Sequence, residues 1–325
     1  MLWYLFDRCI YWIKPLNKDP ILWSGENFHV VKFGIWTSLG TFVSAFAIFF
    51  YLDCRGYPLS QSVWPYFILG GCAIWLFARL GHLINLGNRF FEDPKRYLKE
   101  TSLYNQWGLI AGFLLTCLAI WRLNLPLPIA LDAFAVGTCM GLFFGRIGCY
   151  VYGCCWGKET HADFGVIYKH ELTSVVRQKP QLRGKKLYPT QLLAAFYNLF
   201  LFVLFMFMLF FSAPLGSIFL TFLLLHQGGR LYLEVYRDDM ELEGERNLST
   251  VYMASIFLII GLMFSINEYL GRNVLISNPV IHHKSLLSTS LWDTLTNLYV
   301  WEGAFSISIV MGVLYSFHGK ELGSW

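Results

Sequence analysis

The stretch LDAFAVGTCMGLFFGRIGCYVYGCCWG, residues 131–157, combines a long apolar run with side chains that such runs normally exclude. The run is long enough to cross the hydrocarbon of a bilayer as one helix, which takes about 20 residues. Asp132 and Arg146 nevertheless lie within it. A charge at that depth needs a partner or a function. The stretch therefore predicts a membrane helix that carries a polar site.

The rest of the chain has the composition of a polytopic membrane protein. Of its 325 residues, 56% are hydrophobic and 14% are charged, and the mean hydropathy is +0.48. These values exclude an ordinary water-soluble protein. An eighth apolar run, residues 303–318, fits either a membrane span or a segment at the membrane surface. We predict an all-α fold with seven transmembrane helices, which begin near Ile35, Val63, Trp107, Leu123, Gln191, Ser217 and Leu248.

The chain divides into three predicted regions. Residues 1–30 form an interfacial helix or arm, residues 31–266 form the transmembrane core, and residues 267–325 form a C-terminal extension that holds the eighth run. Residues 158–186 carry seven basic side chains between the fourth and fifth spans, and we expect a small head domain there. Residues 187–229 hold no charge and are broken by a Ser-Ala-Pro-Leu-Gly sequence, which predicts a helical hairpin.

Charged residues at the ends of apolar runs are the first candidates for a site. Arg230, Glu234 and Arg237 are spaced by four and three residues, so they share one helical face. Two guanidinium groups around a carboxylate can hold a phosphate while the carboxylate orients one of them. Arg146 and Arg230 each follow a glycine at the end of a span. We therefore predict that these two arginines contact an anionic lipid headgroup.

Two further intramembrane charges, Arg79 and Asp132, allow two interpretations. A charge in hydrocarbon must be paired or must face a polar cavity. These side chains therefore either bind substrate or belong to a structural network of ion pairs that ties helices together.

Glycines surround Arg146 on both sides. Gly137, Gly141 and Gly145 recur every four residues, which predicts a helix face that packs closely against a neighbour. Gly153, in the loop that follows, permits a sharp turn that brings backbone N–H groups toward an anion.

Cys149, Cys154 and Cys155 have three interpretations. Their spacing differs from the C-x2-C pairs of common zinc sites, and His161 would have to supply a further ligand. A thiol nucleophile or redox pair is the second interpretation, because a nearby arginine lowers the pKa of a thiol. Small packing groups in a tight loop are the third and the favoured one. No metal is expected.

Residues 145–157 resemble the signature loop of the prolipoprotein diacylglyceryl transferases. That resemblance implies a seven-span membrane enzyme that moves the diacylglyceryl group of phosphatidylglycerol onto the lipobox cysteine of a lipoprotein precursor. Further similar segments follow in the order of the family and cover residues 31–264 together with the signature loop: VKFG, ARLGHLINLGNRFFEDPKRYLK, WGLIAG, YPTQLLAAFY and GGRLYLEVYRDD followed by NLST.

The resemblance also implies roles for individual residues. Arg146 takes the place of the family's essential arginine and would clamp the lipid phosphate together with Arg230. Glu234 and Gln106 are the other residues assigned to catalysis. Substrate binding is assigned to Arg79, Asp132, Cys149, Gly153, Cys154, Tyr188, Gln191 and Arg237.

The sequence departs from the family pattern at several positions. Gln106 and Tyr188 stand where the family has histidines, and Phe33 stands where it has a tyrosine. Cys149 and Cys154 replace an asparagine and a glutamate of the signature loop. Lipid binding is therefore better supported than the identity of the acceptor. The candidate bases for the acceptor thiol are Glu234, Tyr188 and His82.

The implied partners are phosphatidylglycerol and a prolipoprotein signal peptide with its lipobox cysteine. We expect a monomer in the cell inner (plasma) membrane that binds no nucleic acid and no cofactor. Two alternatives stay open: a lipid-modifying enzyme with a different, small or cytosolic acceptor, and a non-catalytic lipid-binding membrane protein.

The orientation in the membrane is predicted differently by charge and by resemblance. Most Lys and Arg residues outside the spans fall on the side of the N-terminus, and the positive-inside bias makes that side cytoplasmic. The family resemblance places the same side, with residues 158–186, outside the cytoplasm.

Overall fold

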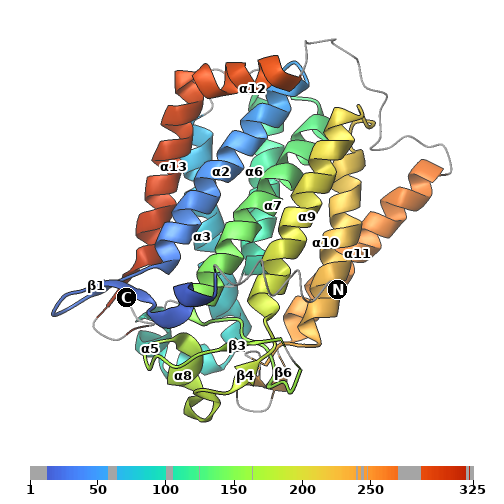
Figure 1. Cartoon of the computed structure of the whole chain (residues 1–325). Helices are drawn as coiled ribbons and strands as arrows, with labels where there is room; N and C mark the ends of the chain where they lie inside the picture. The colour runs from blue at the N-terminus through green and yellow to red at the C-terminus, as the bar shows by residue number, and fades with distance from the viewer. Residues whose placement is uncertain are drawn as a thin grey trace.

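The computed structural model describes residues 13–57, 64–99, 105–123, 125–162, 164–238, 241–242, 245–246, 248–269, 287–319 and 322. Within these ranges, eight helices of 18 or more residues run alongside one another as a bundle (Figure 1). They are α2 (Phe33–Cys54), α3 (Trp64–Leu86), α6 (Asn105–Leu123), α7 (Leu127–Tyr152), α9 (Thr190–Phe210), α10 (Ser217–Glu234), α11 (Leu248–Tyr269) and α13 (Leu298–Ser316). The shorter α12 (Leu287–Thr296) precedes α13.

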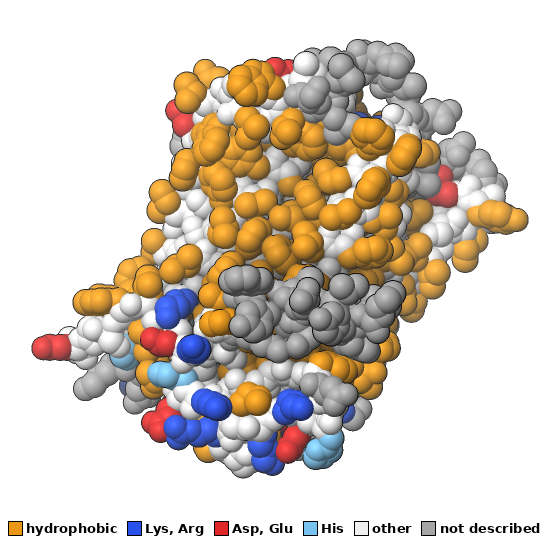
Figure 2. Space-filling view, viewed as in Figure 1, with side chains coloured by type: hydrophobic (Ala, Val, Ile, Leu, Met, Phe, Trp, Pro, Cys, Tyr) orange, Lys and Arg blue, Asp and Glu red, His pale blue; other side chains and the backbone are white. Residues whose placement is uncertain are grey.

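Five of the described helices are long and apolar enough to cross a membrane: α2, residues 68–86 of α3, α7, α9 and α13. The last of these, α13, contains residues 303–316 of the apolar run 303–318, for which the sequence allows two interpretations. Large apolar side chains such as Phe207 on α9 and Ile259 on α11 are exposed. Figure 2 shows hydrophobic side chains over the long sides of the helices. The chain is therefore a multi-pass membrane protein, while its predicted number of seven or eight spans stays a prediction.

Helix α7 is the central element of the bundle, since it packs against α2, α6, α9 and α10. A Cβ on Gly137 would lie 2.5 Å from Cγ1 of Ile48, so only glycine allows α2 to approach this closely. Ser44 Oγ of α2 also donates a hydrogen bond of 2.6 Å to the Gly137 carbonyl. The predicted close seam is confirmed at Gly137. It is wrong at Gly145, where a Cβ would meet no described atom within 4 Å.

Asp132 lies 14 residues before Arg146 on α7, about 21 Å away along the helix axis. Its Oδ2 accepts hydrogen bonds from the Tyr51 hydroxyl (2.9 Å) and the Gly216 N–H (2.8 Å), and its Oδ1 accepts one from the Phe219 N–H (2.8 Å). The carboxylate thus caps the first turn of α10, whose N–H groups have no partner within the helix. These contacts fit the structural interpretation of Asp132, in which its carboxylate ties helices together.

Residues 158–186 fold against one end of the bundle. Strands β3 (Val166–Ile167) and β4 (Lys186–Leu187) pair antiparallel, and α8 (Ser174–Gln178) and the 3-10 helix η3 (Pro180–Leu182) lie between them in sequence. Lys and Arg side chains gather at this end (Figure 2). The segment shares a small apolar core with the ends of α7 and α9, formed by Tyr150, Trp156, Val166, Tyr168, Val175, Val176, Leu182, Leu187 and Leu192.

The fold is mostly helical, as predicted, and the structure adds a few short strands. Strands β1 (Ile21–Ser24), β2 (His29–Val31) and β7 (Phe317–His318) form an antiparallel sheet that joins the N-terminal arm to the chain after α13. Strands β5 (Glu241–Leu242) and β6 (Glu245–Arg246) form a hairpin. Strands this short show no alternating pattern, so the sequence did not reveal them.

The predicted interfacial helix at the start of the arm lies mostly in residues 1–12, outside the described residues. The described part of the arm contains one turn of 3-10 helix, η1 (Lys14–Lys18), before strand β1.

Candidate active site

Arg146 lies in the last two turns of α7, at the end of the bundle that carries β3, β4 and α8 (Figure 1). Its side chain is half-buried. Among the described residues, no carboxylate lies within 4.0 Å of its guanidinium group and no oxygen accepts a hydrogen bond from it. Withdrawing a cation from water without a counterion is unfavourable, so this position favours an anionic ligand.

Backbone hydrogen bonds hold the end of α10 against the loop that follows α7. The Lys158 N–H donates to the Tyr236 carbonyl (2.9 Å), and the Asp238 N–H donates to the Trp156 carbonyl (3.2 Å). Residues 156–158 and 236–238 are therefore neighbours in space, although α8, α9 and α10 lie between them in sequence. This pairing brings the charged end of α10 to the charged end of α7.

The charged face predicted on α10 forms one compact ion-pair group. Arg230 Nη2 lies 2.8 Å from Glu234 Oε2, and Arg237 Nη1 lies 3.3 Å from the same oxygen. The three side chains are 7% to 13% exposed. The carboxylate thus fixes two guanidinium groups side by side, as the spacing predicts.

Arg146, Arg230 and Arg237 are close enough to interact electrostatically with one another. One carboxylate, Glu234, is paired with two of these three cations. These four side chains by themselves therefore carry more positive than negative charge, in a region where the surroundings screen charge poorly. A phosphate or another anion would neutralise this excess.

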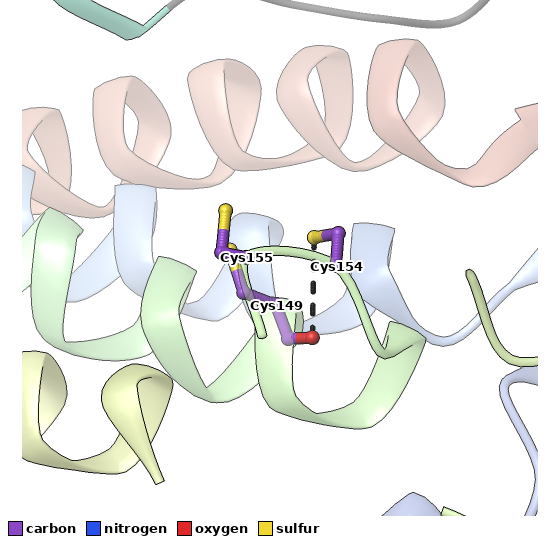
Figure 3. Close-up of side chains that lie close together, drawn as sticks. All are labelled: Cys149, Cys154 and Cys155. Atoms are coloured by element: carbon purple, nitrogen blue, oxygen red, sulfur yellow. Dashed lines mark hydrogen bonds between the residues drawn. The ribbon is translucent and has the colours of Figure 1, made fainter. Parts of the chain in front are cut away.

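The three cysteines of the loop meet beside these arginines. Cys149, Cys154 and Cys155 place their Sγ atoms within 4.8 Å of one another, and Cys154 Sγ lies 3.9 Å from the Cys149 carbonyl oxygen (Figure 3). Cys155 has φ +57°, a left-handed conformation that is strained for any residue with a side chain. His161 is exposed and does not belong to the group.

The three thiols differ in acidity. Hydrogen bonds with the other two thiols, and the charges of Arg237 and Arg146, hold the pKa of the Cys155 thiol well below its usual value. The same hydrogen bonds, together with burial, raise the pKa of the Cys154 thiol. Cys155 is therefore the thiol that carries negative charge most easily beside the arginines.

Side chains at the start of α9 hold the cysteine loop in place. Gln191 Nε2 donates to the Cys154 carbonyl (2.9 Å), and Thr190 Oγ1 donates to the Cys155 carbonyl (2.8 Å). Gly153 ends α7 with φ +82°, which a residue with a Cβ rarely adopts. Gln191 and Gly153 thus shape the loop that carries the thiols, and the structure brings both to the cluster.

Tyr188 lies at the edge of this region. Its ring stacks on Tyr236 with the centroids 4.5 Å apart and the planes at 11°. Burial and the neighbouring Tyr232 raise the pKa of Tyr188, which favours the protonated hydroxyl at neutral pH.

Arg79 is not brought to the cluster. Its Nη2 donates to the carbonyls of Tyr97 (2.5 Å) and Leu98 (3.1 Å). It therefore holds α5 (Pro94–Lys99), which follows the one-turn α4 (Arg89–Glu92), against α3. His82 lies near Arg79. Gln106 belongs to α6, but its side chain lies outside the part of the chain that the structure describes.

His226 lies beside the arginine cluster, and the sequence analysis did not single it out. It lies one turn before Arg230 on α10, is 7% exposed, and interacts electrostatically with Arg230 and Arg146. Its ring stacks on Phe222 with the centroids 4.8 Å apart. Its buried Nδ1 has no hydrogen-bond partner among the described residues. The spacing of four from Arg230 was the available signal, but a single histidine in an apolar helix more often only packs.

A cavity of about 370 Å³ begins at the arginine cluster and extends into the bundle. Arg146 lines one end of it, and its lining residues on α7 continue back to Ala130, roughly 24 Å along the helix axis. The hydroxyls of Thr37, Thr41 and Ser44 line it, but each donates to a backbone carbonyl. The cavity therefore offers apolar walls with a cation at one end, which suits an anionic amphiphile.

Replacing Cys154 with serine is expected to change the activity of the protein by no more than about threefold, because serine keeps the size of the side chain and the loop is held by Gln191 and Thr190. The measurement is the initial rate of the purified variant, with Cys72→Ser on α3 as the control. Complete loss of activity in a stably folded Cys154→Ser protein would instead indicate thiol chemistry at this position.

Comparison with known proteins identifies the family to which the sequence is similar. Residues 20–267 match the family described as prolipoprotein diacylglyceryl transferase. A phosphatidylglycerol–prolipoprotein diacylglyceryl transferase of Dehalococcoides mccartyi is 29% identical over 237 residues, which cover 70% of this chain and 86% of that protein.

Two other relatives match over shorter segments. The transferase 2 of Clostridium perfringens is 32% identical over 146 residues (43% of this chain and 53% of that protein). A relative from Hydrogenovibrio crunogenus is 28% identical over 189 residues (55% of this chain and 65% of that protein). The chain thus spans between half and two thirds of the length of these two relatives. Since the family match covers more than half of its residues, the chain belongs to the prolipoprotein diacylglyceryl transferase family.

Proposed function

We propose that this protein transfers the diacylglyceryl group of phosphatidylglycerol to a cysteine thiol of a prolipoprotein. The observation that carries the proposal is the cluster of three arginines and one glutamate at the end of an apolar cavity, with Arg146 lining that cavity. In this arrangement the lipid phosphate lies against Arg146 and Arg230, and the acyl chains lie between the helices.

The proposed reaction is a substitution at the glyceryl carbon that bears the phosphate. The acceptor sulfur forms a C–S bond to this carbon, and the C–O bond to phosphate breaks. The electron pair of that bond leaves with glycerol phosphate. Negative charge therefore grows on the phosphate oxygens in the transition state, where fixed guanidinium groups stabilise it more than they stabilise the bound lipid.

A base must take the proton of the acceptor thiol. Glu234 is already held between two arginines, and Tyr188 has a raised pKa. We propose His226 instead. An imidazole is largely neutral at neutral pH, and Nδ1 of this one has no hydrogen-bond partner among the described residues.

Replacing His226 with glutamine is expected to lower the rate of transfer by about 10²-fold, the smaller end of what a positioned base contributes. The acid limb of the pH–rate profile should disappear, because a protonated imidazole cannot accept the thiol proton and glutamine does not titrate. His82→Gln is the control, since this histidine lies near Arg79 on α3. An unchanged pH profile in His226→Gln would exclude His226 as the base.

The transferase proposal is tested with purified protein, phosphatidylglycerol and a lipobox peptide. The expected result is a peptide whose mass has increased by one diacylglyceryl unit. Turnover of lipid without modification of the peptide would favour an enzyme with another acceptor. Bound lipid with no turnover under any condition would favour a non-catalytic lipid-binding protein.

We place the protein in the inner (plasma) membrane, with the arginine cluster on the side where lipoprotein precursors emerge. The head segment, residues 158–186, lies at the same end of the bundle as the cluster (Figure 1). Its lysines, such as Lys169 and Lys185, are exposed. They should react with a membrane-impermeant amine reagent on cells whose cytoplasm is sealed. Labelling only after the cells are broken would support the cytoplasmic orientation that the charge bias predicts.

A further inference from the structure

Helix α13 lies beyond residues 20–267, the part of the chain that matches the family. It nevertheless packs along α2 and α3, at the edge of the bundle (Figure 1). A Cβ on Gly34 of α2 would clash with Ser316, and a Cβ on Gly71 of α3 would clash with Ile307. Two glycines of the family-matched region thus leave the space that α13 fills.

The C-terminal end of α13 is held next to α7, the helix that carries Arg146. Strand β7, which follows directly, pairs with β2. The His318 ring meets the Tyr152 ring edge to face, with the centroids 5.4 Å apart, and Tyr152 also accepts a hydrogen bond of 2.7 Å from Arg177 Nη2. The helix is therefore a fixed part of the structure around α7.

One face of α13 lines the cavity that ends at Arg146. Ile307, Met311 and Tyr315 follow one another at intervals of four residues and all line it. On the opposite face, Phe305 and Ile309 are 51% and 61% exposed. The two faces thus differ: one is turned into the cavity and the other is turned outward from the bundle.

The three lining residues lie at different depths. Tyr315 lies near the arginine end, since its ring meets that of Phe33 at 5.7 Å and both line the cavity together with Arg146. Ile307 lies eight residues earlier, about 12 Å deeper along the helix axis. It packs in an apolar cluster with Ala45 and Met311. A chain that enters at Arg146 must pass Tyr315 before it reaches Ile307.

We propose that α13 forms one wall of an acyl-chain site and that Ile307 and Met311 set the length of the lipid chain that the cavity accepts. This inference rests on the proposed function for the identity of the lipid, an anionic phospholipid whose phosphate lies at Arg146. The cavity volume lies within the range of about 300–1,000 Å³ that is usual for ligand sites. Its apolar lining accepts methylene groups, whose number decides the fit.

The test uses the purified full chain with an equimolar mixture of dimyristoyl and distearoyl phosphatidylglycerol. Mass spectrometry gives the ratio of the two lipids bound, and the transfer assay gives the ratio of the two products. Ile307→Trp should shift the bound ratio toward the shorter lipid by about tenfold, because the indole fills the deep part of the cavity. Ile307→Ala should shift it in the opposite direction, which also covers the case in which the tryptophan variant does not fold.

Ile309→Trp is the matched control, since the same change is made two residues away on the exposed face. It should leave the ratio unchanged. Folded Ile307 variants with the wild-type bound ratio would overturn the inference. If the bound ratio shifts but no protein transfers lipid, the inference holds and the transferase proposal fails. If transfer proceeds with an unchanged product ratio, the transferase proposal holds and the inference fails.

Discussion

Arg146→Ala is expected to lower the rate of diacylglyceryl transfer by about 10³-fold or more, the loss that follows removal of a fixed donor from developing negative charge. The effect should be large because this guanidinium lines the cavity and, among the described residues, no carboxylate competes for it. Arg146→Lys should lose about 10²-fold, since an ammonium group keeps the charge but cannot bind two phosphate oxygens in parallel. The measurement is kcat and KM for phosphatidylglycerol.

Arg55→Ala provides the control for Arg146. Arg55 is also half-buried, but it lies at the end of α2, where its Nη2 donates to the Ala213 carbonyl (3.0 Å). This change should leave kcat near the wild-type value once folding is confirmed by thermal unfolding. Equal losses of kcat in the two variants would mean that Arg146 acts through stability, and the proposed phosphate contact would then be wrong.

Arg230→Ala is expected to lower kcat by about 10²–10³-fold. The change removes one guanidinium group. It also leaves the Glu234 carboxylate with Arg237 as its described ion-pair partner. Both effects weaken the stabilisation of negative charge on the lipid phosphate. Glu234→Gln should have a smaller effect, about tenfold, because it keeps the size of the side chain and leaves both arginines in place. The effects should not add in Arg230→Ala/Glu234→Gln, since the two residues form one pair.

The double variant shows whether Glu234 acts by orienting Arg230 or acts separately from it. If Glu234 serves to orient Arg230, the double variant should be no slower than Arg230→Ala. Multiplicative losses would show that Glu234 acts separately from Arg230, for example as the base, and would shift that role away from His226. Kinetics of the two single variants and the double variant at several pH values distinguish these outcomes.

The sequence predicted much of the charged site. Arg230, Glu234 and Arg237 form the expected group because their spacing of four and three places them on one helical face, and helical geometry is local. Gly153 ends α7 in the left-handed conformation for which glycine is suited. Prediction was less successful for charges whose partners come from distant segments. Asp132 caps α10, and no pattern in the sequence indicated which helix end its carboxylate would meet.

Composition and periodicity by themselves determined that this chain is a multi-pass helical membrane protein and that charge lies at the ends of its spans. Its sequence motifs, beginning with residues 145–157, carried the resemblance to a lipid-using enzyme family. Tertiary structure alone decided that Arg237 and His226 lie near Arg146 as well as near Arg230, and that α13 lines the cavity. The physical reason is the distance along the chain over which each feature is determined. Helix formation and the burial of apolar faces depend on neighbouring residues, whereas the meeting of two helix ends depends on the packing of all the helices between them.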